Sequence, residues 1–440
     1  MQIPVARMRE LMALVEPAVS RKRVTTKKGR KTVGATLPAL TCVCVNDGQV
    51  YATNLDVAIS VEAPETRGVA GLLPFKPLEE LLKYARSTDI LTIASVDRLT
   101  IQVSYGGTKI SLKTFDVEDF PPFPITVPLD LDSECVVKGD LFIRNLVEVA
   151  PYAASNDARP VLTCVCLTLG ERLRLAGADG FRLGYTEMEY ALAGAESGKQ
   201  KLLPADVAAV LEQVWKLAPL PPAKPAQDIA ALAPVPRDLK VGFKGSQAFF
   251  FMGGVTVVAH LLDGAFPNYD QLIPKHTHKY LVDPADVRRA IKSTSVVSVD
   301  ASGITRFTFT EDTLLVAAQA EEKGKVGTQI KLLASARECR RIGLNSRYML
   351  EYFQGKTTPV TMSLGEPDQP ITCACPGTPN VVIMPMFIQW EDDPRFKKVE
   401  EPKADAAVAA APPHGAETST APTGEKAEDA SGQDGAEDAA

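Results

Sequence analysis

The chain has 440 residues, a net charge of −6, 45% hydrophobic residues and eight cysteines. No apolar run reaches the roughly 18 residues that cross a bilayer, and the N-terminus lacks the basic-then-apolar order of a signal peptide. We therefore predict a soluble, cytoplasmic protein. The charge is uneven, because residues 391–440 hold 13 acidic and 5 basic residues and leave residues 1–390 at +2. Net charge thus does not exclude nucleic acid as a partner.

The first quarter of the chain carries two helix signals around a buried strand signal. Residues 5–18 have apolar side chains at helical spacing and predict a helix. Residues 20–31 follow with seven Lys and Arg and no acid. The run PALTCVCV at 38–45 predicts a buried strand, and PLEELLKYAR at 77–86 predicts a second helix.

The same order of signals returns twice further along the chain. PVLTCVCL at 160–167 matches the first buried strand at an offset of 122 residues, and helices are predicted around it at 138–154 and 204–218. A third copy has helices at 283–297 and 345–355. Its alternating segment ITRFTFTEDTLLVAA, residues 304–318, predicts a strand.

Longer stretches of the first two copies also correspond. Residues 106–123 and 253–269 both begin with Gly-Gly before an alternating strand pattern. Residues 52–60 correspond to 176–184, and we place Asp56 and Asp179 at equivalent positions in them. A carboxylate pair for metal-dependent hydrolysis is conceivable, but repetition favours a role in turns, where Asp accepts backbone hydrogen bonds.

These repeats predict an α+β protein of three similar domains, each with two helices and many short antiparallel strands. The predicted domains span 1–128, 129–276 and 277–392. A Pro/Ala-rich loop at 218–238 interrupts the second. Residues 393–440 have almost no large apolar side chains and form a predicted disordered acidic tail.

Six cysteines form three Cys-x-Cys pairs in apolar runs: Cys42 and Cys44, Cys164 and Cys166, and Cys373 and Cys375. Alternate residues of a strand share one face, so both thiols of a pair point the same way. A metal or redox site is one interpretation, although zinc sites space their cysteines by two to four residues. We favour the other, small apolar side chains in a buried strand.

Four stretches of the sequence resemble the beta subunit of bacterial DNA polymerase III, the DNA sliding clamp. They are NDARPVLTCV (156–165), ADGFRLG (178–184), DGAFPNYDQLIP (263–274) and VVIMPM (381–386). The segment LNSRYMLEYF at 344–353 resembles the Asn-x-x-Tyr helix of the family's third domain. All five occur in the family's order.

The resemblance implies a homodimeric ring with sheets outside and helices lining a hole for duplex DNA. DNA is then held without sequence readout, and the protein serves as a processivity factor. The implied partners are double-stranded DNA, the polymerase III catalytic subunit, the clamp loader and repair proteins. The resemblance implies no catalysis and no cofactor, and the sequence has no Gly-rich phosphate loop followed by Lys-Ser/Thr.

For DNA contact, the resemblance directs attention to the basic run, to Lys and Arg on the first helices of the second and third domains, and to the polar residue Asn156. Ordinary solvated helix charges are the alternative for the helix residues. The run would form a flexible phosphate-contacting loop, with a solvated turn as the alternative. The predicted DNA-binding residues are Arg21, Lys22, Arg23, Lys27, Lys28, Arg30, Lys31, Lys138, Arg144, Asn156, Arg288 and Arg289.

The resemblance also implies an apolar groove between the central and C-terminal domains that takes short linear motifs of partner proteins. Its predicted residues are Leu162, Gly180, Arg182, Leu183, Pro267, Leu272, Asn345, Tyr348, Val382, Ile383, Met384, Pro385 and Met386. Met and branched aliphatic side chains make an adaptable surface, Arg182 and Asn345 would hold the peptide backbone, and Tyr348 would form a wall. A buried terminal strand is the alternative for VVIMPM. Phe181 and Phe387 depart from the family pattern, which often has His and Arg there.

Ring closure would bring Ile110 and Leu112, on an edge strand, against Val296 and Val297, after the third-domain helix; a place in the core is the alternative for all four. His276 and His278 lie in a polar stretch that we interpret as a solvated linker rather than a metal site. The rival functions are an interaction scaffold without DNA and an unrecognised nuclease.

Overall fold

The computed structural model describes residues 1–20, 37–121, 131–156, 158–194, 198–219, 237–298, 303–320 and 323–389. The chain divides into a compact unit, Met1–Glu391, and a second unit, Asp392–Ala440. The predicted features at 21–31, 393–440 and most of 218–238 lie outside the described residues. Within the described part of the chain, no helix combines the length and apolarity needed to cross a membrane.

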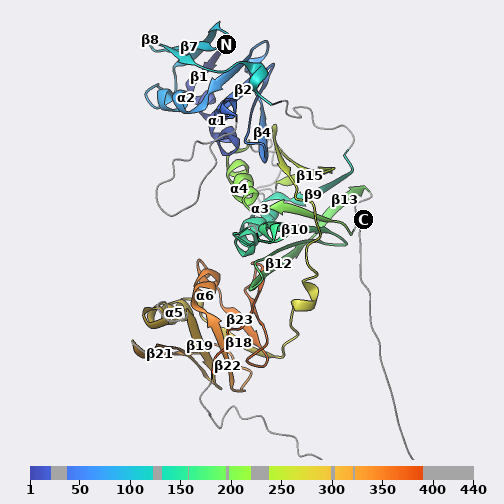
Figure 1. The fold of residues 1–440 in the computed structure, drawn as a ribbon, viewed down its shortest axis with the longest axis vertical. Coiled ribbons are helices and arrows are strands. Elements are labelled where there is room, and N and C mark those ends of the chain that lie inside the picture. Colours follow the sequence, from blue (N-terminus) through green and yellow to red (C-terminus); the bar gives the residue numbers. More distant parts are fainter. Residues whose placement is uncertain are drawn as a thin grey trace, which may run out of the picture. The chain divides into compact units, whose positions relative to one another are not determined.

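Six α-helices occur in the described residues, and they follow one another as three packed pairs (Figure 1). They are α1 (Val5–Val15), α2 (Phe75–Leu82), α3 (Gly139–Val149), α4 (Val207–Leu217), α5 (Pro284–Ser298) and α6 (Ser346–Phe353). All six predicted helices are confirmed. The first helix of the first two pairs tightens at its end into a 3-10 turn, Glu16–Ala18 and Ala150–Tyr152. Each turn contains a proline, which lacks the N–H that the next α-helical hydrogen bond would need.

Each helix pair is accompanied by two groups of antiparallel strands. In the first copy the groups have the orders β1-β6-β7-β8 and β4-β3-β2-β5. The strands are β1 (Gln2–Pro4), β2 (Cys42–Asn46), β3 (Gln49–Thr53), β4 (Val57–Glu62), β5 (Ala70–Pro74), β6 (Ile90–Asp97), β7 (Thr100–Tyr105) and β8 (Thr108–Lys113).

The second copy repeats this plan with one extra strand, in the orders β13-β9-β15-β16-β17 and β14-β10-β11-β12. The strands are β9 (Ser133–Lys138), β10 (Cys164–Leu169), β11 (Leu173–Ala178), β12 (Arg182–Met188), β13 (Tyr190–Gly194), β14 (Gln200–Pro204), β15 (Asp238–Lys244), β16 (Gln247–Met252) and β17 (Val255–His260).

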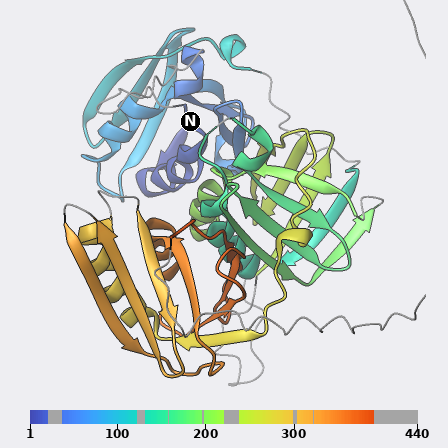
Figure 2. The ribbon, with the colours of Figure 1, turned by 60° about the horizontal axis from the view of Figure 1, so that its bottom comes forward.

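The third copy has the orders β21-β20-β19-β22 and β25-β24-β23-β18, with α5 packed on β20 and β21 (Figure 2). The strands are β18 (His278–Val282), β19 (Ile304–Phe309), β20 (Thr313–Ala320), β21 (Gly324–Lys331), β22 (Arg340–Asn345), β23 (Val360–Leu364), β24 (Ile371–Ala374) and β25 (Asn380–Ile383). The prediction of one strand over 304–318 is wrong. These residues form a hairpin, closed where Thr310 N donates to Thr313 O over 2.8 Å.

Two of the sheets run continuously across the predicted domain boundaries. β17 pairs with β4 to give a nine-stranded sheet, and β12 pairs with β25 to give an eight-stranded sheet. Each junction thus replaces two strand edges by a ladder of backbone hydrogen bonds. The boundaries themselves remain a prediction, because residues 1–391 form one compact unit.

The repeated Gly-Gly sequences make tight hairpin turns. Gly106 and Gly107 have φ of 49° and 85°, and Gly253 and Gly254 have φ of 57° and 85°. A two-residue turn with both φ positive matches the twist of the flanking strands and favours glycine at both places. The equal geometry at β7–β8 and β16–β17 agrees with the predicted repeat.

The Cys-x-Cys residues are all buried, as predicted. On β2 the two thiols pack with Tyr51 and Phe120, whereas Val43 and Val45 join the core beneath the helices. Burial raises the pKa of Cys42, Cys44 and Cys166 to about 11, so their thiols stay protonated near neutral pH. The described residues contain no group of three or more His, Cys, Asp or Glu arranged for a metal ion.

The histidine stretch is not a solvated linker. His276 Nε2 lies 2.7 Å from Pro370 O, and His278 begins β18. His278 Nε2 lies 2.8 Å from the Glu338 carboxylate. Both imidazoles are only partly exposed, because β18 is a sheet strand and the chain before it packs on the turn before β24.

Candidate functional site

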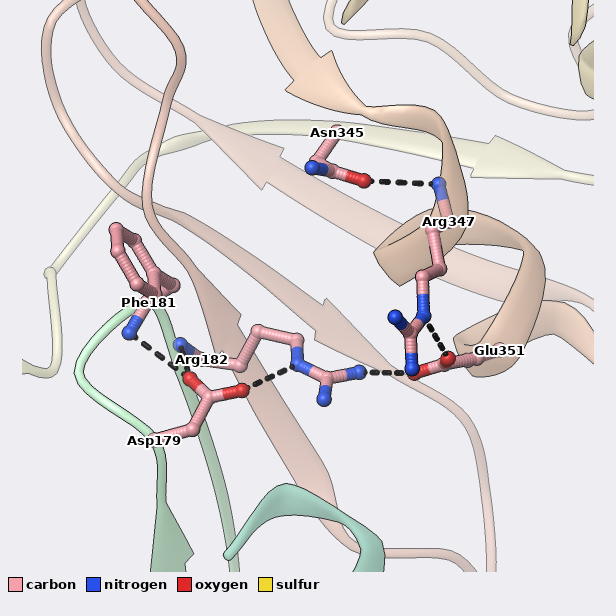
Figure 3. A network of polar contacts seen from close by, with 6 residues as sticks. All are labelled: Asp179, Phe181, Arg182, Asn345, Arg347 and Glu351. Atoms are coloured by element: carbon pink, nitrogen blue, oxygen red, sulfur yellow. Dashed lines mark hydrogen bonds and ion pairs between the residues drawn. The ribbon is translucent and has the colours of Figure 1, made fainter. Parts of the chain in front are cut away.

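The turn before β12 is built around the Asp179 side chain (Figure 3). Its Oδ1 accepts hydrogen bonds from Phe181 N at 2.9 Å and Arg182 N at 2.7 Å, while Gly180 takes a φ of 90°. The predicted turn role of Asp179 is confirmed. In the first copy the matching acceptor is Asn54 Oδ1, which binds Val57 N at 2.8 Å. Asp56 is therefore not the equivalent of Asp179, and that assignment is wrong.

Arg182 connects β12 to α6 and is almost fully buried. Its Nε donates to Asp179 Oδ2 at 3.0 Å and its Nη1 donates to Glu351 Oε2 at 2.5 Å, as Figure 3 shows. The guanidinium also lies 4.2 Å from the centroid of the Tyr348 ring, within cation–π range. Arg182, predicted to hold a peptide backbone, is thus engaged within the protein.

α6 begins with an Asn cap and carries an ion pair on its exposed side. Asn345 Oδ1 accepts from Arg347 N at 2.9 Å, which satisfies one of the unpaired donors at a helix start. Arg347 Nε donates to Glu351 Oε1 at 2.8 Å, one turn further on. Burial alone would raise the pKa of Glu351, but the hydrogen bonds from Arg347 and Arg182 lower it below the ordinary value. Glu351 is therefore a stable anion between two arginines.

Several predicted groove residues form a buried layer rather than an exposed wall. Leu162, Leu183 and Val382 belong to one core cluster together with Phe266 and Tyr269. Ile383 is fully buried in the neighbouring cluster of the third copy. The reason is β25, whose Val382 and Ile383 pair with Leu183 and Arg182 in the centre of the eight-stranded sheet. The alternative for VVIMPM, a buried strand, thus holds for its first three residues.

The exposed apolar surface of the site begins where β25 ends. Met384 is exposed and donates its N–H to Phe181 O at 2.9 Å, and Pro385 has left the ladder, as its missing N–H requires. Met386 N donates to Gly343 O at 2.8 Å. Among the predicted residues, those on the surface are Gly180, Pro267, Leu272 and Met384, with Asn345, Tyr348, Pro385 and Met386 partly exposed.

Two aromatic residues extend this surface. Phe181 is 57% exposed, and its ring centroid lies 6.4 Å from that of Tyr348. Phe387 is 92% exposed. Both were noted in the sequence only as departures from the family pattern and were not assigned to the groove. Phe387 follows Met384 in the uncharged segment 380–390, and this apolar run was the signal that could have included it. Phe181 lies between Asp179 and Arg182 and carried no such signal.

The helix residues predicted to contact DNA have mixed surroundings. Arg144 is exposed on α3. Arg288 Nη1 donates to Phe353 O at 3.2 Å, and Arg289 pairs with Asp286 at 2.8 Å. Surface ion pairs of this kind are weak and can exchange for phosphate. The seven predicted residues between 21 and 31 lie outside the described residues.

Two further DNA candidates lie beside α3 rather than on it. Lys138 is the last residue of β9 and the N-cap of α3, one residue before the helix begins, and it pairs with Asp238 at 2.8 Å. Asn156 is exposed, and its Oδ1 accepts from Ala158 N at 3.3 Å.

The residues predicted for ring closure fall into two groups. Ile110 and Leu112 are partly exposed on β8, which is an edge strand as predicted. Val296 and Val297 lie on α5, not after it, because the helix continues to Ser298. Val296 is 72% exposed whereas Val297 is 8% exposed. The core alternative therefore holds for Val297 and not for Val296.

The fold is shared with solved structures of known proteins. The DNA polymerase sliding clamp of Bacillus subtilis matches with a TM-score of 0.73 and 18% identity, over 88% of this chain and 99% of that one. The chain has the bacterial sliding-clamp fold. A Pseudomonas aeruginosa DNA polymerase III subunit beta matches this clamp fold with a TM-score of 0.71 and 20% identity, over the same shares of both chains.

Sequence comparison agrees with the clamp fold. The chain is 21% identical to the beta sliding clamp of Staphylococcus aureus over 334 residues, which are 72% of this chain and 82% of that protein. A sliding clamp of Bartonella birtlesii solved with griselimycin matches with a TM-score of 0.72 at 20% identity. No family model matches the chain. The resemblance to sliding clamps found in the sequence is confirmed.

Proposed function

We propose that this chain is a DNA sliding clamp, a subunit of a ring that encircles duplex DNA and tethers polymerase and repair proteins to it in the cytoplasm. The observation that carries the proposal is the clamp fold of the described residues, with a helix pair in every copy and sheets continuous between copies. In this proposal the protein acts by encircling DNA and by binding partner proteins. We propose no catalytic step or cofactor for it.

Two strand edges support closure of the ring by a second copy. β8 ends the first four-stranded sheet and β21 ends the corresponding sheet of the third copy. Edge strands present unpaired backbone groups that favour pairing with another chain. A head-to-tail contact made twice gives a closed dimer, and exposed Val296 together with partly exposed Ile110 supplies apolar area for it.

The exposed apolar surface around Met384 supports the docking of partner peptides. Phe181 and Met384 are exposed, joined by a backbone hydrogen bond, and each lies two residues from a member of the buried cluster, Leu183 and Val382. Leu272 is exposed three residues after Tyr269 of the same cluster. A flexible Met beside rigid aromatic rings can adapt to several peptides. We propose the polymerase III catalytic subunit, the clamp loader and repair proteins as the occupants, bound at about micromolar affinity so that they can exchange.

Loading onto DNA tests the ring. The full-length protein should be retained on nicked circular duplex after loading and lost when the circle is linearised, because nothing but the closed path of the DNA holds it. Equal retention on linear DNA contradicts the ring. Partner binding without any DNA retention would identify an interaction scaffold, and metal-dependent cleavage would identify a nuclease.

A matched pair of leucines tests the peptide surface. Leu272 and Leu99 are 51% and 50% exposed, and only Leu272 belongs to the proposed groove. Leu272→Ala should weaken binding of a labelled polymerase peptide about tenfold, from the lost burial of a leucine side chain, whereas Leu99→Ala should leave it unchanged. Equal effects in a fluorescence-anisotropy titration would place the peptide elsewhere.

A further inference from the structure

β5 ends the nine-stranded sheet and pairs with β2 on one side, so its other side is a sheet edge. The Leu72 carbonyl faces this edge, because Thr114 Oγ1 donates to it at 2.6 Å. Hydrogen-bonding directions alternate along an antiparallel strand, so Gly71 faces β2 whereas Ala70 faces the edge. Ala70 is exposed, and its N–H and C=O have no partner among the described residues. The first copy thus offers an unpaired donor and acceptor to another chain.

The second copy closes the equivalent edge of β14 with its own chain. Leu202 corresponds to Leu72, because each is aligned with the second cysteine of a Cys-x-Cys pair. The Leu202 carbonyl accepts from Leu262 N at 2.9 Å. Gln200, two residues earlier, accepts from Phe266 N at 3.1 Å through its side chain, where the first copy has only an alanine. The third copy also bonds the edge of β22, from the chain that follows β25.

A cavity of about 230 Å³, the β5 groove, adjoins the edge of the first copy. It is lined by residues 69–73, and by Ile93 and Ile101 of the other sheet of that copy. The groove is open at Gly71, where a Cβ atom would meet nothing within 4 Å. Its volume is below the range of about 300–1,000 Å³ for sites of independent small molecules. It therefore suits a side chain that belongs to a larger partner.

The β5 groove carries slightly more acid than base. Asp97, Arg98 and Asp116 line it, and Arg98 pairs with Asp116 at 3.2 Å and with Glu118 at 3.6 Å. The N-terminal ammonium of Met1, which also lines the groove, donates to a backbone carbonyl at 2.7 Å. Three carboxylates against two cations leave a negative excess, which favours a partner segment with a Lys or Arg.

We propose that the first copy binds an extended peptide segment of a partner protein as an added strand on β5. The backbone of the segment bonds the N–H and C=O of Ala70, an apolar side chain fills the space over Gly71, and a basic side chain lies near Asp97. In strand addition, backbone hydrogen bonds give affinity and pockets for alternate side chains give specificity. The proposal does not depend on ring closure, which uses β8 and β21.

The probe is the peptide acetyl-Lys-Val-Thr-Val-Lys-amide, whose two Val side chains share one face of a strand. Its binding to the full-length protein is measured by ligand-observed NMR. The matched peptide carries N-methyl groups on the central Thr and the following Val, which removes one N–H from each side of the strand. We expect it to bind at least tenfold more weakly. Equal binding of the two peptides, or no binding of the first at its solubility limit, overturns the proposal.

The charge of the probe tests the basic character of the partner. A peptide with Glu in place of both Lys should bind severalfold more weakly than the probe, and the difference should shrink at high salt. Equal binding of the Glu and Lys peptides overturns the assignment of a basic partner.

Gly71→Val tests the space in the β5 groove. The new side chain enters open space and a strand position suits valine, so the fold should be kept, as urea unfolding can verify. Binding of the probe should fall at least tenfold, because the valine fills the groove. Ala94→Val is the control and should change nothing, since Ala94 is exposed on β6 and does not line the groove.

Ala70→Pro tests the backbone contact separately from the apolar one. Proline lacks the edge N–H but is tolerated on an edge strand, and binding of the probe should fall severalfold. Binding that survives both Gly71→Val and Ala70→Pro overturns the assignment of this site. A mass in light scattering that falls in Gly71→Val would identify a second copy of this chain as the occupant and would overturn the partner protein.

Discussion

The Arg182 guanidinium is held between the Tyr348 ring, 4.2 Å from its centroid, and the Glu351 carboxylate, 2.5 Å away. These residues come from β12 and α6, so one buried cation connects the second copy to the third. Arg182 contacts the Tyr348 ring and leaves the proposed peptide surface to apolar side chains. The connection supplements the backbone ladder between β12 and β25.

Glu351→Gln should lower the free energy of unfolding by about 1–2 kcal/mol, less than the 3–5 kcal/mol for breaking a fully buried pair, because Glu351 is partly exposed. Urea unfolding measures the change. The exposed pair of Lys216 and Glu212 is the control, and Glu212→Gln should cost no more than about 0.5 kcal/mol. Equal losses of unfolding free energy in the two variants would show that the buried ion pair of Arg182 with Glu351 stabilises the protein no more than an exposed ion pair does.

The same two copies carry carboxyl groups of opposite pH behaviour. The pKa of Glu351 is lowered in the folded state, so its stabilising contribution is present above the unfolded pKa of about 4.3 and is lost as pH falls through the folded pKa. Burial raises the pKa of Glu148, so folding is favoured below about pH 4.3 and weakened as pH rises through the folded pKa.

Unfolding free energies between about pH 3 and 7 should therefore respond in opposite ways. In the Glu351→Gln variant, the free energy of unfolding should fall less as the pH is lowered. In the Glu148→Gln variant, it should be higher at neutral pH, relative to its value at about pH 4, than in the parent protein. A parallel shift of both curves would contradict the assigned surroundings of Glu148.

Two buried tyrosines differ in whether the hydroxyl has a partner. Tyr280 OH donates to Glu338 O at 2.8 Å, whereas Tyr352 OH has no partner among the described residues. Tyr280→Phe should cost about 1 kcal/mol, and Tyr352→Phe should be neutral or stabilise by up to about 1 kcal/mol. Thermal or urea unfolding measures the stability of both variants. A clear loss of stability in Tyr352→Phe would show that the Tyr352 hydroxyl has a hydrogen-bond partner after all.

Val296→Glu should dissociate the proposed ring without unfolding its subunits. The side chain is 72% exposed, so its charge is tolerated in the monomer but not in an apolar contact between copies. Light scattering should give about 47.3 kDa for the variant and twice that mass for the unchanged protein. Leu315→Glu, an exposed leucine on β20, is the control; a dimer that survives Val296→Glu places the contact elsewhere.

The basic residues between 21 and 31 should govern how salt affects DNA affinity. Replacing Lys27, Lys28, Arg30 and Lys31 by Gln should reduce the slope of log affinity against log salt by about 0.9 for each lost phosphate contact. The measurement uses the clamp loaded on circular DNA. A slope unchanged from that of the parent protein would contradict contact by this segment.

The repeated fold could be predicted because its signals are local. Apolar spacing identified α1 to α6, and the repeated Cys-x-Cys runs identified β2 and β10. The predicted strands at 38–45 and 160–167 are wrong in their first halves, because Pro38–Thr41 and Pro160–Thr163 form 3-10 turns and the strands begin at Cys42 and Cys164. The hairpin at 304–318 was missed because its turn contains no Gly or Pro, although the alternation of apolar and polar side chains stops at Thr310–Asp312. Asp56 was misassigned because the residue equivalent to Asp179 is Asn54, two residues before Asp56. Asn54 Oδ1 accepts a hydrogen bond from Val57 N, as Asp179 Oδ1 accepts one from Arg182 N.

The interior of the site could not be predicted from local pattern. Arg182 and Glu351 are 169 residues apart, and only the fold brings them together. The β5 groove unites Gly71 with Ile101, and neither stands out in the sequence, because a glycine in an apolar run and an isoleucine in an alternating strand are both ordinary. The burial of Leu162, Leu183 and Val382 likewise depends on the β12–β25 pairing.

That pairing, and its counterpart between β17 and β4, means that the middle third of the protein is not a self-sufficient module. A fragment of residues 131–276 would expose the long sides of β12 and β17 to water, each with a row of unsatisfied amides. Expressed alone, this fragment should aggregate or form domain-swapped oligomers. Antigens, drug screens and truncations should therefore use all three copies together.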